Sequence, residues 1–191
     1  TPSQKFIMWR MVNRIMDKHK TRLFFFDALL LAALVAIDQL TKYAAVQNLK
    51  DKPAIPLIDK ILELSYLENR GAAFGLLQNQ KVFFVLVAVI FLCVIFYVLL
   101  KAPGEKKYDK LNLLLVIIAS GAVGNLIDRL RADYVVDFIY IVLIDFPIFN
   151  VADMYVTFSA ALLVIQVLFV YGDNDFNFLS LHKKSPEKED I

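Results

Sequence analysis

One uninterrupted apolar segment limits what this chain can fold into. Residues 82–100, VFFVLVAVIFLCVIFYVLL, form a run of 19 residues without a charge. At about 1.5 Å per residue, a helix of this length nearly spans the roughly 30 Å hydrocarbon core of a bilayer. Backbone groups find no water in hydrocarbon, so such a segment is expected to cross the membrane as an α-helix.

Three further apolar runs accompany this segment. Hydrophobic residues make up 59% of the 191-residue chain, compared with roughly 45–50% in soluble domains. The sequence therefore predicts an α-helical integral membrane protein with four transmembrane helices, over residues 23–46, 82–100, 111–131 and 151–171. The first run has the basic flank of a signal peptide. However, the polar DQLTK (38–42) stands where a small-residue cleavage site would lie, so we interpret the run as a retained anchor.

Lysine and arginine gather in three segments that share one side of the membrane when the chain crosses it four times. These segments are residues 1–22, 101–110 and 172–191. Because basic flanks stay in the cytoplasm, we expect cytoplasmic N- and C-termini. The connections 47–81 and 132–150 then form outer loops.

The same pattern divides the chain into three parts. Residues 1–22 mix apolar and basic side chains and are predicted to form a basic amphipathic arm at the cytoplasmic face. Residues 23–171 form the membrane domain, and residues 172–191 form a polar cytoplasmic tail.

The first outer loop contains an alternating segment. In KILELSYLEN (60–69), Leu62 and Leu64 share one face, which is typical of a short strand. The preceding PAIPLID (53–59) can supply a second strand. We therefore expect a small extracytoplasmic β-sheet in this loop.

Two aspartates far apart in the sequence are expected at the same depth, at the outer face. Asp137 lies among apolar residues in YVVDFIYIV (134–142), and Asp153 opens the fourth helix in FNVADMYV. Two facing carboxyl groups in a poorly hydrated site tend to hold one proton between them. One can then act as a base toward water while the other donates to a carbonyl oxygen. This chemistry hydrolyses an amide without metal, cofactor or covalent intermediate.

Structural roles for these residues remain open at this stage. Asp153 can stabilise the positive end of a helix dipole, and Asn150 can cap that helix. Asp137 can lie in water among the lipid headgroups. Position alone does not separate these roles from catalysis.

Other chemistries find less support in the sequence. A net charge of +2 indicates no nucleic-acid surface. His19 and His182 fall in segments expected to be cytoplasmic, which excludes a histidine zinc site at the outer face. Cys93, the single cysteine, is predicted to be a buried, inert thiol. No serine and lysine have the spacing of a catalytic pair.

Polar residues cluster in two of the membrane helices. Asp38 and Lys42 are four residues apart and are predicted to form an ion pair on one helix face. In GAVGNLIDR, Asn125, Asp128 and Arg129 are expected to form a polar cluster at the outer end of the third helix. Asp128 is an alternative second catalytic acid, but its neighbour Arg129 favours a structural role.

Five motifs occur in order on these four spans, and together they resemble the lipoprotein signal peptidases, or signal peptidase II. The resemblance covers residues 23–171 and rests on DQLTK (38–42), NRGAAFG (69–75), GNLIDR (124–129), VVDFI (135–139) and FNVAD (149–153).

The resemblance implies a set of site residues. It assigns catalysis to Asp137 and Asp153, and so selects Asp137 over Asp128. Supporting roles fall to Asp38, Lys42, Asn69, Gly71, Asn125, Arg129 and Asn150. It also implies that the short strands form the family's extracytoplasmic cradle. From their small size, we separately hypothesise that Gly71, Ala72 and Ala73 leave room beside the substrate's lipidated cysteine.

The resemblance further implies the reaction and its partners. Family members cleave diacylglyceryl-modified prolipoproteins on the N-terminal side of the lipidated cysteine, at the outer face of the bacterial inner membrane. They are targets of globomycin. We expect membrane lipid as a further partner, and a monomer.

Two other classes are compatible with a four-span chain. A small transporter would use carboxylates to bind ions or protons, and would place them near the bilayer midplane. A structural or assembly protein would tolerate Asn at both aspartate positions.

Overall fold

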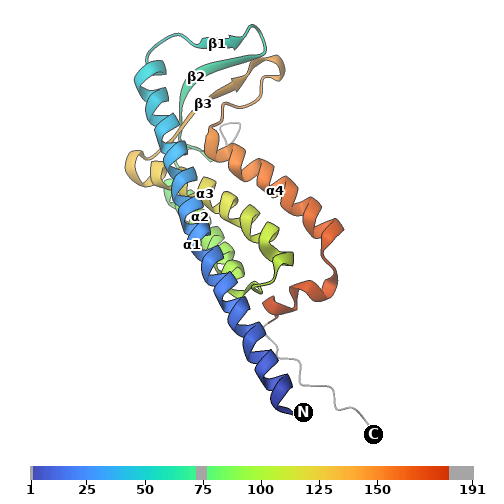
Figure 1. Ribbon diagram of the computed structural model, residues 1–191. Coiled ribbons are helices and arrows are strands. Elements are labelled where there is room, and N and C mark those ends of the chain that lie inside the picture. Colours follow the sequence, from blue (N-terminus) through green and yellow to red (C-terminus); the bar gives the residue numbers. More distant parts are fainter. Residues whose placement is uncertain (1, 72–76, 181–191) are drawn as a thin grey trace.

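The computed structural model describes residues 2–71 and 77–180 (Figure 1). It contains four long helices, α1 (Pro2–Leu49), α2 (Lys81–Lys101), α3 (Asp109–Ala132) and α4 (Val151–Val170), and three strands, β1 (Ile55–Ile58), β2 (Leu62–Asn69) and β3 (Val135–Ile141). Short 3-10 helices are η2 (Lys106–Tyr108), η3 (Val142–Ile144) and η4 (Asp173–Leu179). The sheet lies at one end of the molecule, which we call the sheet end, whereas the start of α1 and η4 lie at the opposite end (Figure 1).

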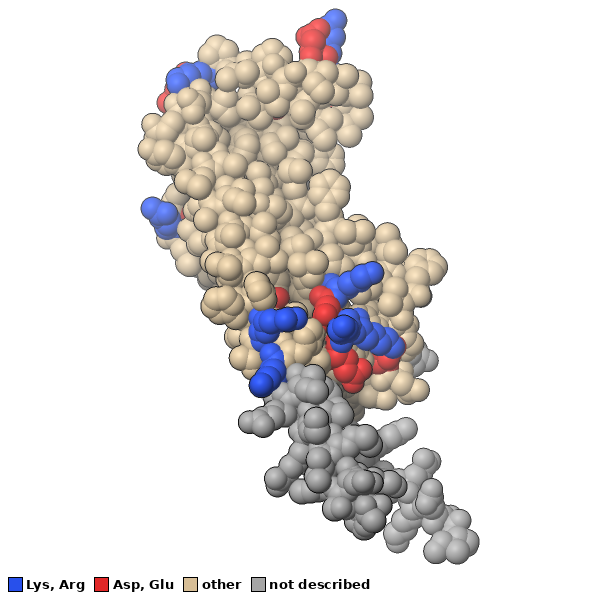
Figure 2. All heavy atoms as spheres, in the orientation of Figure 1, with Lys and Arg blue, Asp and Glu red and all other residues tan. Residues whose placement is uncertain are grey.

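Four helices among the described residues are long and apolar enough to cross a membrane, which confirms the predicted fold class. The candidate spans are Lys18–Leu49, Lys81–Lys101, Lys106–Ala132 and Val151–Val170. Large apolar side chains on α2 and α4 face outward, including Val82 (71% exposed) and Phe169 (82% exposed). On the face shown in Figure 2, most charged side chains lie toward the two ends, one basic side chain projects at the left edge between them, and the rest of the surface between the ends is uncharged. This distribution suits a bundle surrounded by lipid.

The prediction that Cys93 is buried was wrong. The prediction placed its thiol in a buried position, but the side chain is exposed on α2. The physical reason is that a membrane helix is apolar on all sides, so hydrophobicity alone does not indicate which face packs inward.

The first helix is longer than expected. It continues without a break from Pro2 to Leu49, so no turn separates the basic arm 1–22 from the first span. The division of the chain at residue 22 therefore stays a prediction.

The α3 helix is the centre of the bundle and packs against the other three helices. Two glycines permit this approach. A Cβ atom at Gly121 would collide with the backbone carbonyl of Ala152 on α4, and one at Gly124 would collide with the Asp38 carboxylate on α1. Small residues at helix interfaces allow such close contact. The α3 helix accordingly supplies more buried residues to this core than any other element, among them Leu115, Val116 and Ala119.

The small sheet is confirmed, and it has one strand that the sequence did not predict. The strand order is β1-β2-β3, with both pairs antiparallel. The third strand comes from the second outer loop and contains Asp137, which pairs in register with Leu67 of β2. Strand pairing therefore fixes the position of Asp137, which the sequence had placed in a loop.

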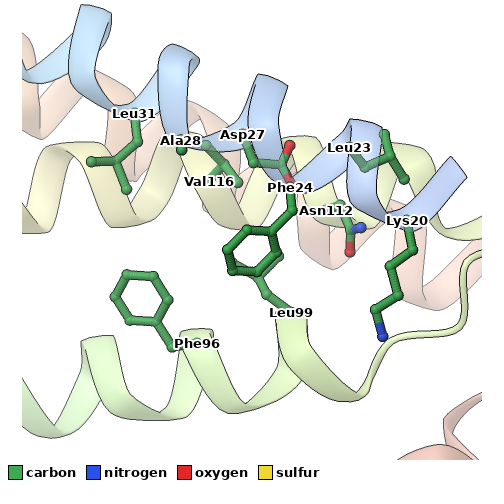
Figure 3. A pocket seen from close by; sticks show the side chains of 10 residues that line it. All are labelled: Lys20, Leu23, Phe24, Asp27, Ala28, Leu31, Phe96, Leu99, Asn112 and Val116. Carbon is green, nitrogen blue, oxygen red and sulfur yellow. The ribbon is translucent and has the colours of Figure 1, made fainter. Parts of the chain in front are cut away.

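A small cavity lies between α1, α2 and α3, toward the end opposite the sheet (Figure 3). Its volume is about 70 Å³, and its lining is apolar apart from Lys20, Asp27 and Asn112. The Asn112 side chain is only 8% exposed, and its carbonyl oxygen Oδ1 has no hydrogen-bond donor among the described residues. A buried acceptor without a partner costs roughly 1–3 kcal/mol of stability.

Replacing Asn112 with leucine is therefore expected to stabilise the protein. Leucine has a similar size, removes the unpaired carbonyl and suits the apolar lining of the cavity. Thermal unfolding in detergent should show a melting temperature several degrees higher, with activity unchanged. Asn112→Ala, which removes the same carbonyl but enlarges the cavity, should gain less. A lower melting temperature for Asn112→Leu would show that the carbonyl has a stabilising partner.

Candidate active site

A larger cavity lies at the sheet end of the bundle. Its volume is about 460 Å³, and it is lined by residues of β2, α3, β3 and α4. Its polar lining comprises Asn69, Asn125, Arg129, Asp137, Asp153 and Thr157, and its apolar lining includes Val135, Ile141, Phe146, Pro147, Ile148, Phe149, Met154 and Phe158. Both predicted catalytic aspartates thus face one cavity that is polar on one side and apolar on the other.

Asp137 lies on β3 and is only 2% exposed. Its Oδ2 accepts a hydrogen bond from Asn69 Nδ2 at 2.8 Å, and its Oδ1 accepts one from Asn150 Nδ2 at 2.6 Å. Burial raises the pKa of this carboxyl to about 7, and the nearby charge of Asp153 adds to the increase. The two amide donors act in the opposite direction because they favour the ionised form.

The raised pKa of Asp137 predicts a stability that depends on pH. Because the folded-state pKa of about 7 lies above the ordinary aspartate value of 3.8, the folded state binds the proton more tightly than the unfolded state. The resulting stabilisation is complete below about pH 4 and is lost as the pH rises through 7. Thermal unfolding of wild type and Asp137→Asn between pH 4 and 8 should show wild type losing stability relative to the variant. A constant difference across that range would contradict this assignment.

Asp153 lies in the first turn of α4, where Asn150 is the N-cap. The Asn150 Oδ1 accepts from the Asp153 backbone N–H at 3.0 Å, and the Asp153 Oδ2 accepts from the Asn150 backbone N–H at 3.1 Å. This reciprocal capping box confirms the predicted cap. The other oxygen of Asp153 accepts from Asn125 Nδ2 at 2.8 Å. The same carboxylate therefore stabilises the helix start and faces the cavity.

Asn150 connects the two aspartates. Its Nδ2 donates to Asp137 Oδ1, while its backbone N–H donates to Asp153 Oδ2. The residue is fully buried. Since one asparagine holds both carboxylates, β3 and α4 cannot move independently without breaking a hydrogen bond to one of them.

A buried ion cluster lies beside the cavity. Lys42 Nζ is 3.0 Å from Asp38 Oδ2 and 2.9 Å from Asp128 Oδ2, which confirms the predicted Asp38–Lys42 pair. Asp38 also accepts from the Ala152 backbone N–H at 3.0 Å, and Asp128 accepts from that of Val136 at 3.3 Å. The cluster thereby joins α1, α3, α4 and β3. Asp128 does not line the cavity, so its contacts agree with the structural role expected from the sequence.

Gln39 belongs to this cluster and was not identified from the sequence. Its Nε2 lies 2.9 Å from Asp128 Oδ1, 3.2 Å from Asp38 Oδ2 and 3.2 Å from the Gly124 carbonyl oxygen. Its place inside DQLTK could have indicated this role, because Gln39 is three residues before Lys42 and therefore lies on nearly the same helix face.

Arg129 and Gly71 complete the cavity lining. The Arg129 guanidinium lies 4.9 Å from the centre of the Phe84 ring, a cation–π contact that joins α3 to α2. The Gly71 backbone N–H donates to Asn69 Oδ1 at 2.9 Å, which orients the Asn69 amide toward Asp137. Ala72 and Ala73, which were expected beside Gly71, lie outside the described residues.

The described residues contain no group of three or more His, Cys, Asp or Glu side chains that could hold a metal ion. His19 lies far from the cavity, at the opposite end of the bundle, where its Nε2 is 3.0 Å from Asp109 Oδ1. His182 lies outside the described residues.

The fold and the cavity define a multi-pass membrane protein with a paired-acid site at one end of its spans. Two solved structures share this architecture, and both are described as bacterial membrane enzymes determined by the in meso method. One has a TM-score of 0.69 and 29% identity, covering 84% of this chain and 94% of its own. The other has a TM-score of 0.68 and 32% identity, covering 76% and 94%.

Sequence comparison identifies the family. The model of the signal peptidase (SPase) II family matches residues 30–169. Lipoprotein signal peptidases from Streptococcus pyogenes serotypes M5 and M18 are each 45% identical over 146 residues, which is 76% of this chain and 93% of the relative. The chain therefore belongs to the signal peptidase II family, a family of bacterial membrane peptidases.

Proposed function

We propose that this protein removes the signal peptide from diacylglyceryl-modified prolipoproteins as an aspartic endopeptidase. It cleaves on the N-terminal side of the lipidated cysteine with Asp137, Asp153 and an activated water. The observation that carries the proposal is the convergence of these two carboxyl groups, one buried and one partly buried, on one cavity, linked through Asn150. No metal ion or covalent intermediate is needed, because a paired acid and base can activate water and polarise a carbonyl.

The shape of the cavity suits a substrate that combines a peptide with lipid. Its polar side presents Asp137 and Asp153 to the scissile bond, and its apolar side, including Phe146, Met154 and Phe158, suits acyl chains. The cavity lies at the sheet end of the spans, so a substrate within the membrane plane can place its lipid in hydrocarbon and its peptide bond at the interface. Globomycin is expected to compete for this cavity.

The charge distribution supports an orientation. Lys101, Lys106, Lys107 and Lys110 lie in or beside the connection between α2 and α3. This connection contacts η4 through the Lys107–Asp175 pair and the early part of α1 through Lys20, and so belongs to the end opposite the sheet. By the excess of basic residues in cytoplasmic segments, that end faces the cytoplasm and the paired acids face outward. The protein is then a multi-pass, monomeric enzyme of the bacterial inner membrane, with both termini in the cytoplasm.

The decisive experiment uses purified protein in lipid with a synthetic prolipoprotein in two forms, with and without the diacylglyceryl group. We expect cleavage before the cysteine of the modified form only, at equal rates with and without a chelator. Equal cleavage of the unmodified form would exclude recognition of the lipid, and no cleavage of either form would remove the proposed activity.

A substitution at Gly71 tests whether the lipid of the substrate lies beside this residue. Gly71 is buried and lines the cavity, so a larger side chain would occupy space that the substrate needs. Gly71→Leu is expected to lower the rate on lipid-modified substrate by roughly 10-fold or more, because misplacement of about 1 Å can cost 100-fold. The rate is measured on a variant whose melting temperature matches wild type. Unchanged turnover would contradict the placement of the lipid near Gly71.

A further inference from the structure

The hydrogen bonds of Asn125 fix the orientation of its amide. Its Oδ1 accepts from Lys42 Nζ at 2.8 Å and from Asn150 Nδ2 at 3.1 Å. An ammonium group can only donate hydrogen bonds, so the carbonyl oxygen must face Lys42. The Nδ2 group then faces Asp153 and donates to its Oδ1 at 2.8 Å.

The hydrogen-bond donors around Asp153 favour its ionised form, whereas its partial burial acts in the opposite direction. Both of its oxygens accept from N–H donors, one of them the backbone N–H of Asn150. Its place in the first turn of α4 adds the positive end of the helix dipole. Only the ionised carboxylate can take a proton from water, and these donors stabilise that form.

The surroundings of Asp137 differ in two respects. It lies on a strand, which supplies no comparable dipole, and it is only 2% exposed. Like Asp153, it accepts from two neutral N–H donors, here the side-chain amides of Asn69 and Asn150, so the donors do not separate the two residues. Its pKa of about 7, raised first by burial and then by the charge of Asp153, is consistent with a carboxyl group that holds a proton.

The other charged groups around the pair do not reverse this difference. On α1 and α3, Lys42 is paired with both Asp38 and Asp128, and Arg129 lies on the cavity wall. On β2, Glu68 is paired with Lys50 and Arg70, and at the start of α2, Lys81 is paired with Asp133. Because two aspartates already surround Lys42, we assign its main effect to the orientation of the Asn125 amide.

We propose that the pair is asymmetric: Asp153 is the base, Asp137 holds the shared proton as the acid, and Asn125 is the positioning residue that maintains the difference. This inference rests on the proposed function. The Asp153 carboxylate takes a proton from water, whose oxygen bonds to the peptide carbonyl carbon while Asp137 donates its proton to the carbonyl oxygen. In the second step, the C–N bond breaks as Asp153 returns its proton to the leaving nitrogen. Asp137 takes a proton back from one hydroxyl of the intermediate.

Two matched asparagine variants test the assignment through the pH dependence of kcat/KM. Asn125 donates only to Asp153, so Asn125→Ala should destabilise that carboxylate. The rise of kcat/KM on the acid side of the profile (the acid limb) should then move up by about one pH unit, while the fall on the alkaline side (the alkaline limb) stays in place. Asn69 donates to Asp137, so Asn69→Ala should move only the alkaline limb upward by a similar amount. Asn125→Ser, which keeps a donor, should restore much of the acid limb. A shift of the opposite limb, or of neither limb, would overturn the assignment.

A second measurement does not depend on activity. Infrared titration of the full-length protein in lipid compares Asp137→Asn, which leaves Asp153 alone, with Asp153→Asn, which leaves Asp137 alone. The remaining carboxyl group should titrate at a lower pH in Asp137→Asn than in Asp153→Asn, and the reverse order would overturn the assignment. If that order fails while both variants are inactive, the inference fails alone. If both variants retain activity, the proposed function fails.

Discussion

Asp137→Asn and Asp153→Asn should each lower the rate of prolipoprotein cleavage by at least about 1,000-fold while the chain stays folded. In the proposed mechanism, each change removes an acid or base that transfers a proton in the transition state, a contribution of typically 100- to 10,000-fold. Asparagine keeps the size of the side chain, so the cavity should keep its shape. The measurement is single-turnover cleavage of a diacylglyceryl prolipoprotein by each purified variant.

A third aspartate provides the matched control. Asp133 is exposed and paired with Lys81 at the surface, and it does not line the cavity. Asp133→Asn, the same chemical change, should leave the rate unchanged. Asp153→Asn also alters the capping box of α4, which costs about 1 kcal/mol at most sites, so its melting temperature must be measured as well. Cleavage above half the wild-type rate by both cavity variants would disprove the catalytic role of the pair.

Lys42→Met is expected to give the largest loss of stability. Lys42 is only 3% exposed, and its removal leaves Asp38 and Asp128, themselves 0% and 8% exposed, without their shared cation. Breaking a buried ion pair by removing one partner costs roughly 3–5 kcal/mol. Thermal unfolding in detergent should show a much lower melting temperature, or too little folded protein to purify.

Lys81→Met makes the same substitution at a surface pair. Lys81 contacts Asp133, and their side chains are 36% and 63% exposed. Exposed pairs contribute little because water screens them, so the melting temperature should stay close to wild type. Equal effects of the two methionine variants would show that the cluster around Lys42 is hydrated rather than buried.

Local patterns were sufficient for features that depend on neighbours along the chain. The four spans follow from run length, the Asp38–Lys42 pair from a spacing of four residues, and the Asn150 cap from its place before α4. In each case the interacting groups lie within about one helical turn of each other, or within one helix. Hydrophobic periodicity and capping preferences indicate contacts between residues that are this close in the sequence.

Features that depend on distant segments were missed or left open. The strand β3 forms because residues 135–141 pair with β2, and this partner lies more than 60 positions earlier. Gln39 joins the ion cluster only because α3 packs against α1 closely enough for Gly124 and Asp128 to reach it. The exposure of Cys93 depends on which face of α2 the other helices cover.

The amino-acid sequence by itself determined that this chain is a four-span membrane protein of the signal peptidase II family, because run length and ordered motifs are properties of the linear chain. Only the tertiary structure decided which acids share a cavity. Asp128 and Asp137 are both aspartates in the same part of the sequence, but one is paired with Lys42 and the other lines the same cavity as Asp153. That difference arises from packing between elements distant in sequence, where burial and neighbouring charges determine the protonation state of a carboxyl group.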